Sequence, residues 1–313
     1  MSRRKILVTG GGGYIGAVLV PALLRRGYCV TVVDNFMYRQ NSLALSCRNP
    51  DLQVVCLDVR CSTDMEPLIK EADVIIPLAA IVGAPACVKD PVTATTTNRV
   101  AILSLLREVC PEQTIIMPTT NSAYGSGGAN NFCDEHSPLN PLSQYANEKV
   151  EVEQALLQHP RAISLRLATV FGMSPRMRLD LLVNDFTWRA VTDKSLVLFE
   201  GDFKRNYVHV VDVARAFLHV LTHEDMMKGR IYNVGLSSAN VSKKELCAII
   251  KKQVPDFHYV ESSVGKDPDQ RNYVVSNARI EAMGYKALIS LDEGIAELIK
   301  GYQSLRGSLY TNI

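Results

Sequence analysis

A tyrosine and a lysine four residues apart, Tyr145 and Lys149, occur in the stretch NPLSQYANEKV. Pro141 and Ser143 suit the start of a helix, where residues four apart lie on one face about a turn from each other. A free tyrosine loses its proton near pH 10, and a nearby ammonium lowers that pKa because it stabilises the phenolate. Such a pair could take the proton from an alcohol while a hydride leaves the same carbon. The spacing is also common by chance, and the alternative is an exposed helix pair.

A second candidate site lies near the N-terminus, where Gly10, Gly13 and Gly16 have the spacing GxxGxxG within GGGGYIG. The apolar run KILVT (5–9) precedes these glycines, and an amphipathic helical pattern follows over about residues 14–26. A strand, a glycine turn and a helix in this order let a pyrophosphate approach the backbone at a free helix N-terminus. The alternative is a glycine-rich turn that binds nothing.

An acidic residue, Asp34, ends the second apolar run, eighteen residues after Gly16. A carboxylate there can accept hydrogen bonds from the adenosine ribose hydroxyls and would repel a 2′-phosphate. We therefore expect NAD rather than NADP, although Arg39 nearby leaves NADP open, and Asp34 could instead be a turn residue before Asn35. Asp58, at the end of the third run, could meet the adenine amino group.

Continuous apolar runs alternate with helical patterns through the first half of the chain. This alternation predicts an α/β fold, a doubly wound parallel sheet of the Rossmann type. The expected strands are 5–9, 29–33, 53–57, 73–77, 113–117 and 162–168, and the expected helices are 14–26, 64–71, 97–109 and 143–158.

The pattern changes after Phe171, where a loop containing Pro and Arg begins. We expect a dinucleotide-binding domain over 1–170, with 207–234 returning to it, and a smaller α/β lobe made from 171–206 and 235–313. The later expected elements are helices near 179–192, from Asp212, near 242–253 and near 291–305, and strands at 196–199, 207–211 and 231–234.

Composition excludes several classes of function. The chain has 313 residues, a net charge of +2 and no long basic block, so neither nucleic acid nor a membrane surface is an expected partner. No apolar run approaches the roughly 18–20 residues of a membrane span, and the N-terminus lacks a signal-peptide pattern. The eight Cys never have the spacing CxxC and the six His are scattered, so we expect reduced thiols, no metal site and a cytoplasmic protein.

The motifs together resemble the extended short-chain dehydrogenase/reductase family, in its nucleotide-sugar epimerase/dehydratase branch. The resemblance covers nearly the whole chain and rests on GGGGYIG, Asp34, LDV, PLAA, Asn98, TTNSAYG, YANEK, RLATVFG and KRNYVHVVDVA. Many members have histidine where this chain has Pro77, a change that should be mild because the cofactor contact there is mostly backbone.

The resemblance implies roles for individual residues. The hydroxyl four residues before the Tyr of the Tyr124-Gly125 pair would hydrogen-bond the reacting sugar hydroxyl, and that residue is Thr120. Lys149 could also bind the nicotinamide ribose. The expected cofactor contacts are Gly10, Gly13, Tyr14, Ile15, Gly16, Asp34, Asn35, Asp58, Val59, Leu78, Ala79, Ala80, Asn98, Tyr145 and Lys149.

The reaction type depends on the two residues after Thr120. Family members that eliminate water carry Asp-Glu there, whereas this chain has Asn121 and Ser122. Neither side chain can act as a general acid or base near neutral pH. A 4,6-dehydratase is therefore disfavoured, and oxidation at C4 remains, with the hydride either kept by the cofactor or returned to the sugar.

Arginine is the best side chain for gripping the diphosphate of a sugar nucleotide. Arg205 falls on the family's diphosphate arginine, and Arg271 is a second candidate; a solvated surface charge is the alternative for each. The remaining expected substrate residues are Asn121, Ser122, Thr169, Arg176 and Arg178.

Longer strings, such as AAIVGAPAC and DPDQRNYVVSN, are similar to those of the GDP-D-glycero-α-D-manno-heptose 4-dehydrogenases of bacterial capsule biosynthesis. This resemblance implies retained NAD and a 2-oxo acid that re-oxidises NADH. A 4-epimerase that uses the same residues remains the main alternative, and a non-catalytic NAD sensor or RNA-binding scaffold a distant one. By analogy with the family, we expect a homodimer formed through helices 97–109 and 143–158.

Overall fold

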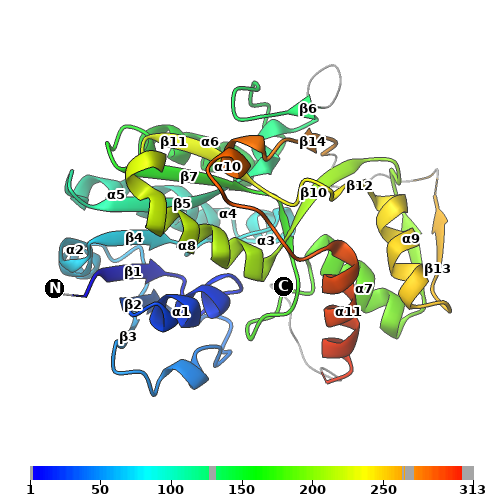
Figure 1. Cartoon of the computed structure of the whole chain (residues 1–313), viewed down its shortest axis with the longest axis horizontal. Coiled ribbons are helices and arrows are strands. Elements are labelled where there is room, and N and C mark those ends of the chain that lie inside the picture. Colours follow the sequence, from blue (N-terminus) through cyan, green and yellow to red (C-terminus); the bar gives the residue numbers. More distant parts are fainter. Residues whose placement is uncertain (1–2, 127–131, 263, 265–270, 305–313) are drawn as a thin grey trace.

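The computed structural model describes residues 3–126, 132–262, 264 and 271–304. A parallel seven-stranded sheet runs through the larger part of the molecule, in the order β11-β7-β5-β4-β1-β2-β3 (Figure 1). Its strands are β1 (Lys5–Thr9), β2 (Cys29–Asp34), β3 (Leu52–Cys56), β4 (Val74–Pro77), β5 (Thr114–Thr120), β7 (Ala162–Leu167) and β11 (Arg230–Val234). The predicted doubly wound α/β fold is confirmed.

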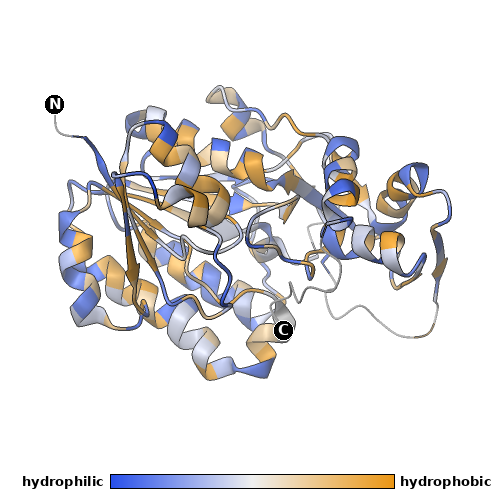
Figure 2. Cartoon of the chain, turned by 90° about the horizontal axis from the view of Figure 1, so that it is seen from below, coloured by the Kyte–Doolittle hydropathy of each residue, from blue (hydrophilic) through white to orange (hydrophobic). Residues whose placement is uncertain are grey.

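Helices cover both faces of this sheet. Helices α1 (Gly16–Arg25) and α8 (Val210–Met227) pack together on one face, and α2 (Ser62–Glu71), α5 (Ala101–Glu108) and α6 (Gln144–Leu156) lie on the other. The alternation along β1 shows the two cores directly, because Ile6 and Val8 pack with α1 while Leu7 packs with α2 and α5. Apolar residues accordingly follow the strands at the centre of the molecule (Figure 2).

A second group of elements lies beside the sheet, at the right in Figure 1. It contains the three-stranded sheet β12-β10-β8 and the pair β13-β9. Helices α7 (Leu182–Thr192), α9 (Lys243–Gln253) and α11 (Leu291–Tyr302) pack on one another over a separate apolar core. The strands are β8 (Thr169–Phe171), β9 (Ser195–Leu198), β10 (Lys204–His209), β12 (Asn240–Ser242) and β13 (His258–Glu261).

Shorter elements complete the described chain. They are η1 (Ala44–Ser46), α3 (Ala84–Lys89), α4 (Pro91–Thr95), η2 (Thr96–Val100), η3 (Asn121–Tyr124), β6 (Phe132–Cys133), β14 (Val274–Val275) and α10 (Ala278–Ala282). No helix in the part of the chain that the structure describes is long and apolar enough to span a bilayer.

The expected strand at 207–211 differs from the structure. The strand is β10 (Lys204–His209), and α8 begins at Val210 rather than at Asp212. The side chain of His209 accepts a hydrogen bond from the Val211 amide and so caps the helix. The apolar run crosses this boundary because Val210 and Val213 are buried helix positions. Of the segment 207–234, β11 joins the large sheet, whereas β10 pairs with β8 and β12.

A buried carboxylate joins α8 to the chain that leads into α11. Asp212 is fully buried and accepts hydrogen bonds from the amides of Leu288 (3.0 Å) and Ile289 (2.8 Å), and it pairs with Arg215. The Leu288 and Ile289 amides belong to no helix or strand and therefore have no backbone partner in such an element. The Asp212 carboxylate accepts their hydrogen bonds instead.

We predict that Asp212→Asn destabilises the fold without changing the cavity described below. The amide cannot accept both backbone hydrogen bonds as well as a carboxylate can, so the free energy of unfolding should fall by about 2 kcal/mol or more. Urea denaturation followed by circular dichroism measures this change. An unchanged unfolding midpoint would contradict the role given to Asp212.

Candidate active site

A cavity of about 400 Å³ lies at the carboxyl ends of β1, β2, β4 and β5. Thr169, on β8 of the second group of elements, also lines it, and so does Arg271, which precedes β14. Twenty of the sequence-predicted residues meet along its wall: Gly10, Gly13, Tyr14, Ile15, Gly16, Asp34, Asn35, Asp58, Val59, Leu78, Ala79, Ala80, Thr120, Ser122, Tyr145, Lys149, Thr169, Arg176, Arg178 and Arg271.

The glycine loop makes its turn by close packing against β4. Gly10 has φ +67°, and a Cβ at this position would lie 2.5 Å from the Ala79 amide nitrogen. Only glycine adopts this conformation and this spacing without strain. Helix α1 then starts with Ile15 as its N-cap and has no side-chain cap hydrogen bond. The positive end of the helix therefore faces the cavity without a side-chain cap, as an anionic pyrophosphate requires.

The Asp34 carboxylate stands at the far end of this loop. Its oxygens accept hydrogen bonds from the Gly12 amide (2.9 Å) and the Phe36 amide (2.8 Å). Burial raises its pKa, and these two hydrogen bonds oppose that shift. Each oxygen keeps a further lone pair, so the group can also accept from ribose hydroxyls. The residues present thus fit an adenine dinucleotide.

Asp58 lies on the same side of the cavity and forms an ion pair with Arg60 (2.7 Å). Hydrogen bonds from Arg60 lower the pKa of Asp58 to about 2, so the group is a carboxylate at neutral pH. A carboxylate can accept a hydrogen bond from the adenine amino group.

The hydroxyl of Thr120 stands at the end of β5. It accepts a hydrogen bond from the Ser122 amide (3.0 Å) and donates one to the Ser122 hydroxyl (2.9 Å). Tyr145 and Lys149 reach the same cavity from α6, whose first turn is capped by Ser143 through the Ala146 amide (3.2 Å). The Lys149 ammonium lies 5.9 Å from the centre of the Tyr145 ring.

Burial dominates the ionisation of this pair. It raises the pKa of Tyr145 to about 12, a shift that the charges of Arg178 and Arg271 oppose. Burial also lowers the pKa of Lys149 to about 8, with the Glu148 charge opposing it. The cations around the cavity therefore favour the phenolate form of Tyr145, whereas burial favours the neutral phenol.

Three expected site residues are not among the described residues that line the cavity. Both polar side-chain atoms of Asn98 bond the backbone of Ile81, at 2.8 and 2.9 Å, so Asn98 shapes the loop after β4. Asn121 is buried behind Thr120 and Ser122. Arg205 is 1% exposed within β10. We expected these three residues to contact a ligand directly, and the residues that line the cavity do not support that expectation.

The other three arginines that the sequence predicted as substrate residues occupy different places on the wall. Arg271 donates to the Ser122 hydroxyl, so it lies beside Thr120. Arg178 forms an ion pair with Asp180. The guanidinium of Arg176 lies 3.9 Å from the ring centre of Tyr38, on the same side of the cavity as Asp34. Arg176, expected to contact substrate, is thus placed where the adenosine half of a dinucleotide would lie.

The segment after β8 is joined to the glycine loop by contacts that the sequence did not indicate. The Tyr14 hydroxyl donates to the Gly172 carbonyl (2.7 Å), and the Ser174 hydroxyl donates to the Tyr14 carbonyl (2.8 Å). With the Arg176–Tyr38 contact, these bonds join the segment after β8 to the glycine loop and to the residues that follow β2. No local spacing could predict them, because the partners are more than a hundred residues apart.

We predict that Arg176→Leu speeds the release of a bound dinucleotide. Loss of a partly buried cation–π contact costs about 1–2 kcal/mol, equivalent to roughly 5- to 30-fold. Liquid chromatography of NAD released from the protein over time measures the rate. Tyr38→Phe is the matched control, because it keeps the ring and should release NAD as the unaltered protein does. Equal rates for Arg176→Leu and the unaltered protein would contradict the prediction.

We predict that Lys149→Met shifts the rising limb of the pH–rate profile to higher pH. Removing a positive charge near the phenolate raises the pKa of Tyr145, so less base is present at a given pH. A charge at this range should move the limb by roughly 1–2 pH units. Because burial raises the pKa of Tyr145 to about 12, turnover between about pH 6 and pH 10 lies on this rising limb, and the shift should appear as a lower rate at each pH. An unshifted limb would show that Lys149 does not act on Tyr145.

Comparison with known proteins gives one family match. The model of the NAD dependent epimerase/dehydratase family matches residues 6–235. A provisionally assigned UDP-glucose 4-epimerase of Methanocaldococcus jannaschii is 27% identical, over 94% of this chain and 97% of its own.

Many solved structures have the same fold, two sugar-nucleotide enzymes among them. A UDP-glucose 4-epimerase of Thermotoga maritima, solved with UDP-glucose, superimposes with TM-score 0.82 at 25% identity, over 96% of this chain and 99% of its own. DesIV, a dTDP-glucose 4,6-dehydratase of Streptomyces venezuelae solved with NAD, does so with TM-score 0.82 at 25% identity, over 97% and 98%.

Proposed function

The chain belongs to the NAD-dependent epimerase/dehydratase family, and we propose that it oxidises the C4 hydroxyl of a nucleoside-diphosphate sugar. NAD is the cofactor that the family implies, and the glycine loop and Asp34 fit it. The observation that carries the proposal is that Thr120, Tyr145 and Lys149 share one cavity with that loop.

The proposed reaction divides the work among these three residues. The Tyr145 phenolate takes the proton of the C4 hydroxyl, while the Thr120 hydroxyl hydrogen-bonds the same oxygen. Bound NAD supplies the acceptor for the C4 hydride. Loss of one proton and one hydride leaves a 4-ketone, and the Lys149 ammonium stabilises the phenolate before the proton moves.

The residues that follow Thr120 support oxidation without loss of water. Ser122 shares hydrogen bonds with Thr120 and Arg271, and Asn121 is buried. Eliminating water from C5 and C6 needs a group that gives a proton and one that takes a proton, and amide and hydroxyl side chains do neither near neutral pH. A 4,6-dehydratase is therefore not proposed, although the family contains such enzymes.

The finer proposal is a GDP-heptose 4-dehydrogenase that retains NAD and passes electrons to a 2-oxo acid. The longer sequence strings around 79–87 and 267–277 support it. Arg271 and Arg178 are the proposed contacts for the substrate diphosphate, since both line the cavity. A 4-epimerase is the second candidate, and the description of the Methanocaldococcus jannaschii relative favours it.

We also propose a homodimer formed through α5 and α6. Apolar side chains beside these helices support it, since Val92 is 73% and Val100 49% exposed. Sedimentation of the purified protein gives its assembly state.

We predict that the NAD-loaded protein oxidises GDP-D-glycero-α-D-manno-heptose. Nicotinamide absorbance should rise as NADH forms on the protein and fall when 2-oxoglutarate is added, with a 4-keto sugar seen by NMR. Tyr145→Phe should keep its NAD and lose turnover by about 100- to 10,000-fold.

Other outcomes separate the alternatives. A sugar inverted at C4, without lasting NADH, would establish the 4-epimerase in place of the dehydrogenase. A product that has lost water would contradict the reading of Asn121 and Ser122. Absence of any reaction with GDP-, UDP-, dTDP- and CDP-sugars would contradict the proposed oxidation itself.

A further inference from the structure

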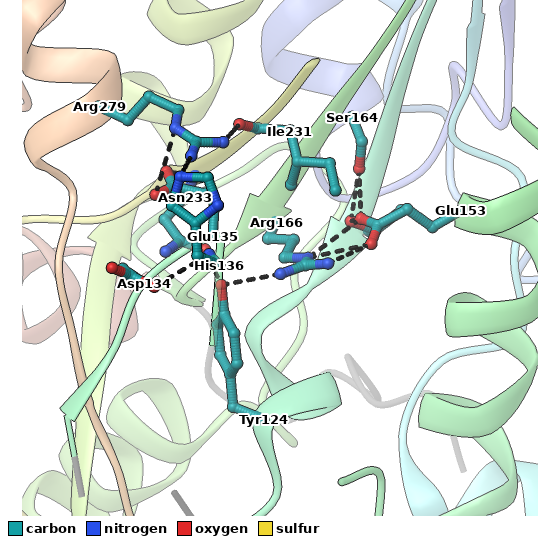
Figure 3. Close-up of polar contacts among 11 residues, drawn as sticks. Tyr124, Asp134, Glu135, His136, Glu153, Ser164, Arg166, Ile231, Asn233 and Arg279 are labelled. Atoms are coloured by element: carbon teal, nitrogen blue, oxygen red, sulfur yellow. Dashed lines mark hydrogen bonds and ion pairs between the residues drawn. The ribbon is translucent and has the colours of Figure 1, made fainter. Parts of the chain in front are cut away.

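A buried carboxylate lies behind the cavity on the helix that carries Tyr145 and Lys149. Glu153 stands one turn beyond Lys149 on α6 and is 3% exposed. It accepts hydrogen bonds from the hydroxyls of Thr119 (2.8 Å) and Ser164 (2.6 Å), on β5 and β7. It also pairs with the guanidinium of Arg166, whose Nε lies 3.1 Å from it (Figure 3).

The same network reaches the turn that follows Thr120. Arg166 donates to the Tyr124 hydroxyl (3.0 Å), and Tyr124 ends the short helix η3 that contains Asn121 and Ser122. The Tyr124 hydroxyl in turn donates to Asn233 on β11 (2.7 Å). Figure 3 shows these side chains as one continuous polar path from α6 across β7 to β11. One carboxylate thus joins the two elements that carry the reacting groups.

Distances along the chain show why this link matters. Thr119 directly precedes Thr120, and Lys149 is one helical turn from Glu153. Any sliding of α6 along β5 would separate Tyr145 from Thr120 and would break the bond between Glu153 and Thr119. Apolar packing alone is non-directional, whereas a buried carboxylate with several donors has one favourable arrangement.

A buried charge pair at this position is not by itself evidence that the pair stabilises the fold. Replacing a buried ion pair by apolar side chains of similar volume is often neutral or stabilising, whereas removing one partner is costly. Glu153, Ser164 and Arg166 are absent from the described residues that line the cavity. Their contribution to turnover would therefore be indirect.

We propose that Glu153 is a positioning residue that holds Tyr145 and Lys149 in register with Thr120, a role that rests on the proposed oxidation. It acts through α6 and β5, and it touches neither substrate nor cofactor. Arg166 holds the carboxylate and orients Tyr124 at the turn after Thr120.

Single and double variants test this role. Glu153→Gln should slow reduction of bound NAD by the sugar about 10- to 100-fold, because misplacement by about 1 Å has such an effect. The substrate KM and the NAD content should stay close to those of the unaltered protein. Thr119→Val removes the hydrogen bonds of the strand hydroxyl to Glu153 and to Ser164, keeps the charge pair, and should slow the same step in the same direction.

The double variant Glu153→Leu/Arg166→Met separates positioning from stability. It leaves no unpaired buried charge, so its urea midpoint should recover relative to Glu153→Gln, while its rate of NAD reduction should stay low. Recovery of both would overturn the proposal, because the pair would then be structural only. Asp212→Asn is the control, since it should lose stability and keep the rate.

A crystallographic comparison needs no substrate and separates this proposal from the proposed function. In Glu153→Gln, α6 should be displaced along β5 relative to the unaltered protein, with Lys149 moved with respect to Thr120. An unmoved helix would overturn the positioning role whatever the protein oxidises. An unaltered protein that oxidises no sugar nucleotide would contradict the proposed function and leave the structural comparison to decide the role of Glu153.

Discussion

Parallel pairing of β1 with both β2 and β4 is the constraint on which the site depends. The ladders place Thr9 opposite Val33 on one side and Pro77 on the other, so three strands end at one edge of the sheet. The chain must then turn sharply at Gly10 while the Ala79 backbone lies against it. Because β5 ends at the same edge, Thr120 comes to face the dinucleotide loop rather than the opposite side of the sheet.

Charge is distributed around this edge in two layers. Cationic groups, among them Arg178, Arg271 and Lys149, line the cavity where a phosphate-bearing sugar and a phenolate would need them. Behind the wall, the Glu153–Arg166 pair is closed off from the cavity and bonded on several sides. The cationic groups of the first layer favour binding of anions. The proposed role of the buried pair in the second layer is to restrict the position of α6 along β5. No acid follows Thr120 directly in the sequence, where Asn121 and Ser122 stand, and for this reason the proposed reaction is an oxidation rather than a loss of water.

Features with local signals could be predicted from the sequence. The strand, glycine turn and helix of residues 5–25 and the Tyr145–Lys149 helix are set by neighbours within a few residues. Contacts between distant segments could not be predicted, and Arg176 with Tyr38 and Glu153 with Arg166 are of this kind. Arg205 was expected at the cavity because of its motif, yet β10 buries it. The motif around Arg205 predicts the strand on which it lies, whereas the burial of its side chain depends on how the second group of elements packs.

The most direct test of the account is transfer of the hydrogen at C4. We would supply the NAD-loaded protein with GDP-heptose that carries deuterium at C4 alone and examine the cofactor by mass spectrometry. The account predicts deuterium on the nicotinamide ring, with slower reduction than the unlabelled sugar gives. Reduced cofactor without deuterium would mean that another carbon is oxidised, and the roles given to Thr120 and Tyr145 would be wrong.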